Sequence, residues 1–204
     1  MTSSTTRRVR PAHGSDVDAI RRIYGAAVTG TFASFEEAVP DREELLRRMN
    51  ARPRTPWLVA ESVDPTEADP TEDEDGVVGY AFASRHHERA AYRWSADCSV
   101  YLTPAYHGRG IGRLLLERLV AEMQELGYVS LFAGIALPNE ASVRLHEGIG
   151  FRSAGVFPHA GFKQGSWRDV GWWSLQLVRS LPVDPADPRE WDPARWESAR
   201  RSRS

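Results

Sequence analysis

The sequence predicts one α/β domain built on a mixed β-sheet of about six to seven strands with helices on both faces. The main observation is that short apolar runs typical of strands alternate with amphipathic segments of helical period. In chain order these segments read β-α-α-β-β-β-α-β-α-β-β. The second observation is the length, since 204 residues suit one well-buried domain and are short for two.

The first half of the chain predicts strand, helix, helix and a long hairpin. Val9-Arg10 ends a short strand, and a helix begins near Ser15-Asp16. A second helix begins at Pro40-Asp41, where Asp41 can cap it and Glu44 follows three residues later, as in a capping box. Two strands follow, and the predicted ranges are 57–60 and 77–83.

The second half predicts a strand, a long helix, an apolar strand, a shorter helix and two closing strands. The long helix carries an apolar stripe of residues at helical spacing and stops at Gly127. The shorter helix ends at Gly150. The predicted ranges are 95–102, 110–126, 129–135, 139–149, 151–157 and 167–178.

Three segments fall outside the predicted core of the domain, which spans residues 9–180. Residues 1–8 are expected to be disordered, and residues 62–76 form a flexible acidic loop with eight acidic side chains between positions 61 and 75. Residues 181–204 are proline-rich and arginine-rich and are expected to be a poorly ordered tail, in which only Trp191 and Trp196 are suited to docking.

The composition argues against several classes of protein. Outside the acidic loop the chain is mildly basic, which suits an anionic cofactor but is too scattered for nucleic acid. No stretch approaches the roughly 18 apolar residues of a membrane span, and the first ten residues lack the apolar core of a secretory signal. Cys98 is the single cysteine, so we expect no disulfide and a cytoplasmic protein. No metal site is predicted.

A glycine-rich loop joins the strand 95–102 to the helix 110–126 and carries the strongest chemical signal. Its core is His107-Gly108-Arg109-Gly110-Ile111-Gly112. Free N–H groups at a helix start, approached closely through glycines, favour a diphosphate. The loop lacks the Gly-Lys-Ser/Thr of a nucleotide P-loop and the final spacing of a dinucleotide fingerprint. A glycine turn without a ligand stays open as the alternative.

The loop resembles the acetyl-CoA signature of the GCN5-related N-acetyltransferases, Arg/Gln-x-x-Gly-x-Gly/Ala, with His107 in the first position. The segment from Asn139 to Phe151 resembles a later helix of the same family. The resemblance implies acetyl-CoA as co-substrate and implies that its contacts lie in the strand end, the loop and the later helix. These residues are Val100, Tyr101, Leu102, His107, Gly108, Arg109, Gly110, Ile111, Gly112, Arg113 and Asn139.

Longer segments resemble the phosphinothricin N-acetyltransferases within that family, from about Val9 to Val178. They include 57–61, 92–97, 99–101, 137–139, 142–147 and 160–171. The resemblance implies direct attack of a primary amine on the acetyl-CoA thioester in one ternary complex. It also implies a homodimer and a small amino acid analogue such as phosphinothricin or methionine sulfoximine as acceptor. Another small amine, or a CoA-binding sensor without catalysis, are the alternatives.

Two residues are candidates for proton transfer, which the amine needs because its pKa near 8 leaves it mostly protonated. Asp97 stands where the family has a glutamate base, and strand alternation places it on one face with Ser99 and Tyr101. A structural ion pair is the alternative for Asp97. His146 shares a helix face with Asn139 and is either a second base, the acid that protonates the CoA thiolate, or a structural histidine.

Substrate recognition is predicted from Phe35, Tyr92 and Arg93. Arg93 can pair with a substrate carboxylate or phosphinate, and Lys163 and Arg168 are alternatives. The tryptophans of the last strand, Trp167, Trp172 and Trp173, are expected in the core or in a dimer contact.

Overall fold

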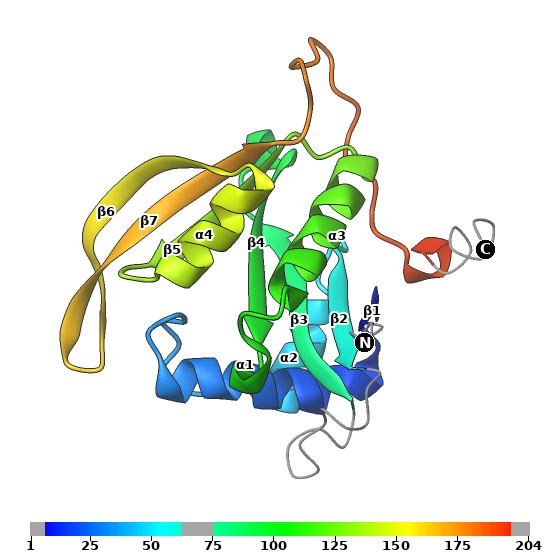
Figure 1. The fold of residues 1–204 in the computed structure, drawn as a ribbon. Helices are drawn as coiled ribbons and strands as arrows, with labels where there is room; N and C mark the ends of the chain where they lie inside the picture. Colours follow the sequence, from blue (N-terminus) through cyan, green and yellow to red (C-terminus); the bar gives the residue numbers. More distant parts are fainter. Residues whose placement is uncertain (1–6, 63–75, 197–204) are drawn as a thin grey trace, which may run out of the picture.

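The computed structural model describes residues 7–62 and 76–196, and Figure 1 shows how their helices and strands are arranged. Most of the predicted N-terminal segment 1–8 and of the acidic loop 62–76 lies outside these residues, as does the tail beyond residue 196. Within the described part, no helix is long and apolar enough to cross a membrane.

One seven-stranded sheet forms the centre of the molecule, with the order β1-β2-β3-β4-β5-β7-β6. All neighbours are antiparallel except β4 and β5, which run parallel, so the predicted mixed sheet is confirmed. The strands are β1 (Arg7–Pro11), β2 (Trp57–Ser62), β3 (Val77–Arg85), β4 (Ser95–Leu102), β5 (Ser130–Ala136), β6 (Arg152–Lys163) and β7 (Ser166–Gln176).

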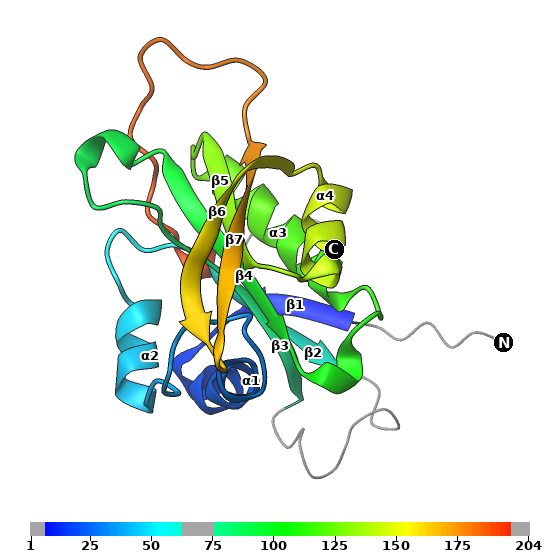
Figure 2. The same ribbon diagram turned by 90° about the vertical axis from the view of Figure 1, so that its left-hand side faces the viewer.

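Helices cover both faces of the sheet, which agrees with the continuous burial of β2 and β3 (Figure 2). On one face α1 and α2 pack with Tyr80 and Trp57, and on the other α3 and α4 pack with Leu58 and Ala81. The helices are α1 (Val17–Gly30), α2 (Arg42–Met49), α3 (Ile111–Glu125) and α4 (Glu140–Ile149), with short 3-10 turns η1 (Gly14–Asp16), η2 (Ala90–Tyr92) and η3 (Pro104–Tyr106).

The predicted start of α2 is correct, but the capping box is one-sided. The carboxylate of Asp41 accepts a hydrogen bond from the backbone N–H of Glu44 at 2.8 Å. The Glu44 carboxylate instead pairs with Arg47 and Arg48, at 2.6 and 2.7 Å. Because both arginines lie within one turn of Glu44, their charge outcompetes the backbone N–H of Asp41.

The parallel pairing of β4 with β5 is short. It runs from Ser95 opposite Ser130 to Asp97 opposite Phe132, and no further. Beyond that point β4 continues to pair with β3 and β5 with β7, so the two central strands separate within the sheet. A gap in the middle of a sheet leaves backbone N–H and C=O groups of both strands without a ladder partner.

The two tryptophans of the tail that were considered suited to docking pack against the domain. Trp191 is only 4% exposed, its backbone N–H donates to the carbonyl of Arg54, and its indole N–H donates to Glu122. Trp196 is also buried, beneath the guanidinium of Arg118. The prolines of this segment remove N–H donors but leave its tryptophans free to pack, so the segment crosses the domain as an ordered strap.

The last two strands form a longer hairpin than predicted. β6 runs to Lys163 through residues expected to be a connection, because the turn at Gln164 and Gly165, both with positive φ, reverses the chain tightly. Trp173 belongs to the core, while Phe157, Phe162 and Trp167 stay more than half exposed. The hairpin curves away from the rest of the sheet towards the loop that follows α1 (Figure 1).

Candidate active site

A cavity of about 590 Å³ fills the gap between β4 and β5. Its walls come from β4, β5, the start of α3 and α4, and on the other side of the sheet from the end of α1. Many of the residues predicted to hold the cofactor line it. They are Val100, Tyr101, Leu102, His107, Gly108, Gly110, Gly112, Arg113 and Asn139, and His146 lines it too.

The glycine loop presents backbone rather than side chains to this cavity. Gly108 and Gly110 have φ of 72° and 80°, in the left-handed region that favours glycine. Gly110 is the N-cap of α3, and no side chain caps the helix there. The first N–H groups of α3 therefore remain available to an anion at the cavity mouth, where the helix dipole adds to the attraction.

Two predicted loop residues take other positions. The side chain of Ile111 is buried in the core, so this residue can offer a ligand only its backbone. The guanidinium of Arg109 lies over the ring of Tyr106 at 5.1 Å and does not line the cavity.

Asp97 lies at the end of the paired region, directly beside the cavity rather than in its lining. The lining begins at Cys98 on β4 and at Ala133 on β5, one position beyond the last paired residues. Ser99 and Tyr101, two and four residues after Asp97, do line it. Because strand residues two apart share a face, Asp97 lies on the same face of β4 as these two lining residues.

The carboxylate of Asp97 has a partner that the sequence reasoning missed. Its Oδ1 lies 2.6 Å from Nδ1 of His86. Burial raises the pKa of Asp97 above its usual value, and the hydrogen bond with His86 opposes that shift. The alternation of β3 could have revealed this partner. Ser84 pairs with Asp97, and His86 lies two residues further on the same face of the strand.

His146 is buried, and its ring is fixed in one tautomer. Nδ1 donates to the carbonyl of Ser142 at 2.8 Å, and the ring packs edge-on against Phe151. Among the described residues, Nε2 has no hydrogen-bond partner, although it is buried. Burial lowers the pKa of His146, so the ring is neutral at pH 7 and Nε2 is an acceptor. This state suits a base or an acceptor and lacks the proton that an acid would need.

The oxygen of Asn139 caps α4. Its Oδ1 accepts from the backbone N–H of Ser142 at 3.1 Å, which leaves its amide NH₂ for the cavity that it lines. Cys98 also borders the cavity, but burial raises the pKa of its thiol well above the usual value, so it stays protonated.

The predicted substrate residues separate in the structure. Tyr92 contacts the rings of His86 and His87, next to Asp97. Phe35 lies in the loop between α1 and α2 and covers Gly161 of the hairpin, where a Cβ would stand only 2.3 Å from its ring. Arg93 is not among the residues that line the cavity, and its guanidinium pairs with Asp187 of the tail at 2.8 Å, so its predicted contact with a substrate carboxylate is not supported.

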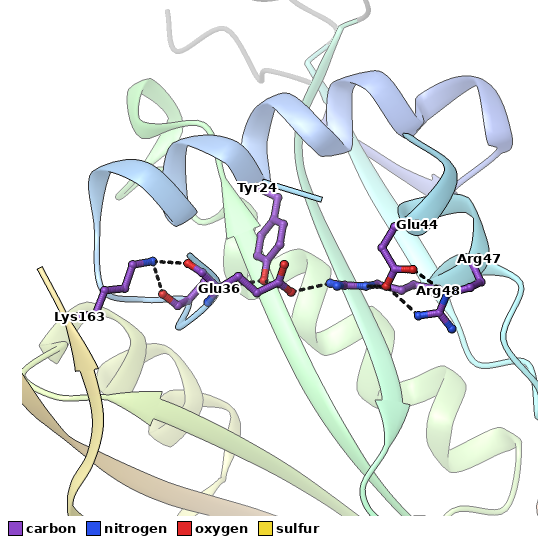
Figure 3. A network of polar contacts seen from close by, with 7 residues as sticks. Tyr24, Glu36, Glu44, Arg47, Arg48 and Lys163 are labelled. Carbon is purple, nitrogen blue, oxygen red and sulfur yellow. Dashed lines mark hydrogen bonds and ion pairs between the residues drawn. The ribbon is translucent and has the colours of Figure 1, made fainter. Parts of the chain in front are cut away.

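The loop between α1 and α2 borders the cavity with Thr31 and Ala33 and is held from two sides. On one side Lys163 donates to the carbonyls of Val28, Ser34 and Glu36. Figure 3 shows Lys163 beside Glu36 in this loop. Burial lowers the pKa of Lys163.

On the other side Glu36 accepts from Tyr24 and Arg48, at 3.0 and 2.6 Å. Arg168 lies over the ring of Phe32 in the same loop. The two cations considered for substrate binding, Lys163 and Arg168, therefore hold the cavity rim.

Comparison with known proteins agrees with this geometry. The model of the acetyltransferase (GNAT) family matches residues 27–151. The phosphinothricin N-acetyltransferase of Streptomyces viridochromogenes is 33% identical, over 88% of this chain and 93% of its own length. The L-methionine sulfoximine/L-methionine sulfone acetyltransferase of Salmonella typhimurium is 35% identical, over 86% of this chain and 98% of its own.

The fold also matches solved structures. A GNAT superfamily phosphinothricin acetyltransferase from Sinorhizobium meliloti, in complex with acetyl-CoA, superimposes with a TM-score of 0.78. It is 33% identical to this chain, covering 89% of this chain and 94% of that one. The chain therefore belongs to the GNAT acetyltransferase family and is an acetyl-CoA-dependent N-acetyltransferase.

Proposed function

We propose that this enzyme moves the acetyl group of acetyl-CoA to the amino group of a small amino acid analogue, such as phosphinothricin or methionine sulfoximine or sulfone. The amine attacks the thioester directly while both substrates are bound. One observation carries this proposal: a single cavity connects the glycine loop on one face of the sheet, through the gap between β4 and β5, to the end of α1 on the other. Such a passage lets two substrates meet from opposite faces.

The residues of the cavity fit acetyl-CoA. The free N–H groups at the start of α3 suit its diphosphate, and His107 and Arg113 add polar or charged groups nearby. The unpaired backbone edges at Val100–Leu102 of β4, and at the facing part of β5, suit an extended amide chain. Asn139 completes this side with its amide. When bound, acetyl-CoA supplies the thioester carbonyl that the amine attacks.

The carboxylate of Asp97 supplies a negative charge beside the site proposed for the acceptor amine. A free amine is needed for attack, and a carboxylate with a raised pKa is a better proton acceptor than an exposed one. Asp97 serves the proton transfer, either by accepting the proton itself or by positioning a neighbouring group that accepts it. His146 lines the α4 side of the same cavity with an unprotonated Nε2 and is the second candidate for proton transfer.

The acceptor side favours a small amine. Tyr92 beside Asp97 and Phe35 on the loop between α1 and α2 are aromatic groups bordering this side, and the loop is tied down by Lys163. Two relatives are named for acetylation of phosphinothricin and of methionine sulfoximine and sulfone, and a third is named an L-amino acid N-acyltransferase, which supports an amino acid or an amino acid analogue as acceptor.

We also propose that the enzyme is a cytoplasmic homodimer. The hairpin of β6 and β7 carries the exposed Phe157, Phe162 and Trp167, and a second copy of the chain is the occupant expected to cover them. Cys98 is an unpaired, buried thiol, which fits a reducing compartment.

A panel assay tests the proposed function. The purified protein is incubated with acetyl-CoA and single amines, free thiol is followed over time, and the product is identified by mass spectrometry. N-acetylated phosphinothricin or methionine sulfoximine, with little reaction of simple alkylamines, is the expected result. If only other amines give product, the proposed class of acceptor is wrong. Binding of acetyl-CoA in calorimetry without any product would indicate a CoA-binding sensor instead.

A further inference from the structure

The pair of His86 and Asp97 lies at the point where β4 and β5 separate. His86 directly follows the end of β3, and Asp97 is the last residue of β4 that pairs with β5. Ser84 of β3 pairs with Asp97, so the alternation of the strands brings His86 onto the same face. The Nδ1–Oδ1 distance of 2.6 Å is that of a strong, charge-assisted hydrogen bond.

Aromatic side chains hold the imidazole ring on its other sides. It stacks on Phe132 with the ring centres 4.5 Å apart, and it meets the edge of Trp172 at 6.0 Å. Trp172 in turn covers Gly134, which lines the cavity, with its ring atoms 3.3 to 3.5 Å from where a Cβ would stand. The imidazole ring is therefore held between Phe132 and Trp172, and Trp172 connects it to the cavity wall at Gly134.

The two ring nitrogens of His86 differ in their surroundings. Nδ1 is engaged by Asp97, whereas no described residue makes a hydrogen bond with Nε2. Asp97 and Tyr92 are the titratable groups among the described residues that contact the ring. A carboxylate at Nδ1 holds the proton there, so Nε2 carries the lone pair, and the same carboxylate stabilises the imidazolium that forms when Nε2 takes a proton.

We propose that His86 is the general base of the transfer and that Asp97 is the residue that positions it. This inference rests on the proposed function. The ammonium form of the amine gives one proton to Nε2 of His86 and becomes a neutral amine. Its nitrogen forms a bond to the thioester carbonyl carbon, the carbon–sulfur bond breaks, and CoA leaves as the thiolate. The second N–H proton ends on the sulfur, and His86 releases its proton to water.

Two substitutions of His86 separate catalysis from packing. His86→Phe keeps an aromatic ring on Phe132 but has no base, and His86→Ala leaves room for added imidazole. Both are expected to lower kcat by at least about 100-fold and to leave the KM for acetyl-CoA within about twofold. Added imidazole should restore turnover of His86→Ala and should not restore His86→Phe. His87→Ala is the matched control, since this neighbouring histidine does not contact Asp97.

A measurement without turnover tests the positioning by Asp97. In protein labelled with ¹⁵N-histidine, the ring shifts of His86 should show the proton on Nδ1 at pH 8, and Asp97→Asn should abolish this preference. A proton on Nε2 in the wild-type protein, or a His86→Ala enzyme that keeps its turnover within about threefold, would overturn the proposal. A wild-type protein that acetylates no amine would instead overturn the proposed function, and the tautomer result would still stand.

Discussion

The ammonium group of Lys163 lies 2.5 Å from the backbone carbonyl oxygen of Ser34, which joins the β6–β7 hairpin to the loop between α1 and α2. Two further carbonyls of the same region, those of Val28 and Glu36, accept from the same nitrogen. A cation shared by three carbonyls fixes a short loop more firmly than any single hydrogen bond. The rim of the cavity on the acceptor side therefore depends on a residue over one hundred positions away in sequence.

Replacing Lys163 should loosen this rim. Lys163→Met removes three hydrogen bonds and leaves three carbonyls to find water, so we expect the KM for the amine to rise about tenfold and stability to fall by about 1–3 kcal/mol. The KM for acetyl-CoA should change by less than about twofold, because the glycine loop is untouched. Steady-state kinetics on both substrates check this. Gln164→Ala is the control, and equal effects of the two substitutions would contradict the role of Lys163.

Gly110 should be essential for cofactor binding. At φ of 80° a Cβ strains the backbone, and Gly110→Ala is expected to cost about 1 kcal/mol of stability and to shift the N–H groups at the start of α3. We expect affinity for acetyl-CoA, measured by calorimetry, to fall at least about tenfold. Gly30→Ala, at the end of α1 with open space around it, is the matched control. If Gly110→Ala binds acetyl-CoA as tightly as the wild type, the diphosphate does not bind at the start of α3.

The neutral ring of His146 predicts a pH effect on stability. Burial lowers the pKa of His146 below that of the unfolded chain, near 6.5, so the unfolded state binds more protons in the window just below that value. The native protein should therefore lose stability as pH falls through this window and gain nothing from a further rise above it.

Urea unfolding at pH 7.5 and pH 5.5 checks the effect. The difference in free energy of unfolding between these two pH values should be smaller in His146→Gln than in the wild type. An equal or larger difference in the variant would show that His146 is not the group that resists protonation.

The ordered part of the tail should contribute to stability. Trp191→Ala removes a buried indole and leaves a cavity between the tail and α3, so we expect a loss of about 3–5 kcal/mol. For a protein of this size that loss lowers Tm by roughly 6–20 °C. Val183→Ala, in a fully exposed part of the same segment, should leave Tm unchanged. If both variants melt together with the wild type, the tail does not pack as described.

Most of the fold follows from local patterns. The continuous apolar runs of β2 and β3 and the apolar stripe of α3 reflect burial against neighbouring layers, which each segment shows in its own sequence. The full length of the β6–β7 hairpin and the partners of the tail tryptophans could not be predicted from local patterns. Trp191 is ordered by Arg54 and Glu122, far away in sequence, and no pattern within a proline-rich segment reveals such partners.

The candidate site also combines residues found from local sequence patterns with residues that only the tertiary structure brings together. The glycine loop, Asn139 and His146 were predicted because each belongs to a continuous stretch with a recognisable spacing. Arg93 was expected at the substrate because it precedes the strand of Asp97, but its charge is taken by Asp187 of the tail. His86 was missed, since only the register of β3 against β4 brings it to Asp97.

The most direct test of the mechanism is to measure turnover and acetyl-CoA affinity together on Asp97→Ala. The substitution removes the carboxylate beside the gap and leaves the glycine loop intact. We predict that kcat with the best amine of the panel falls by at least about 100-fold, while the calorimetric Kd for acetyl-CoA stays within about twofold of the wild type. Turnover that persists while acetyl-CoA affinity falls would contradict a role of Asp97 in the proton transfer.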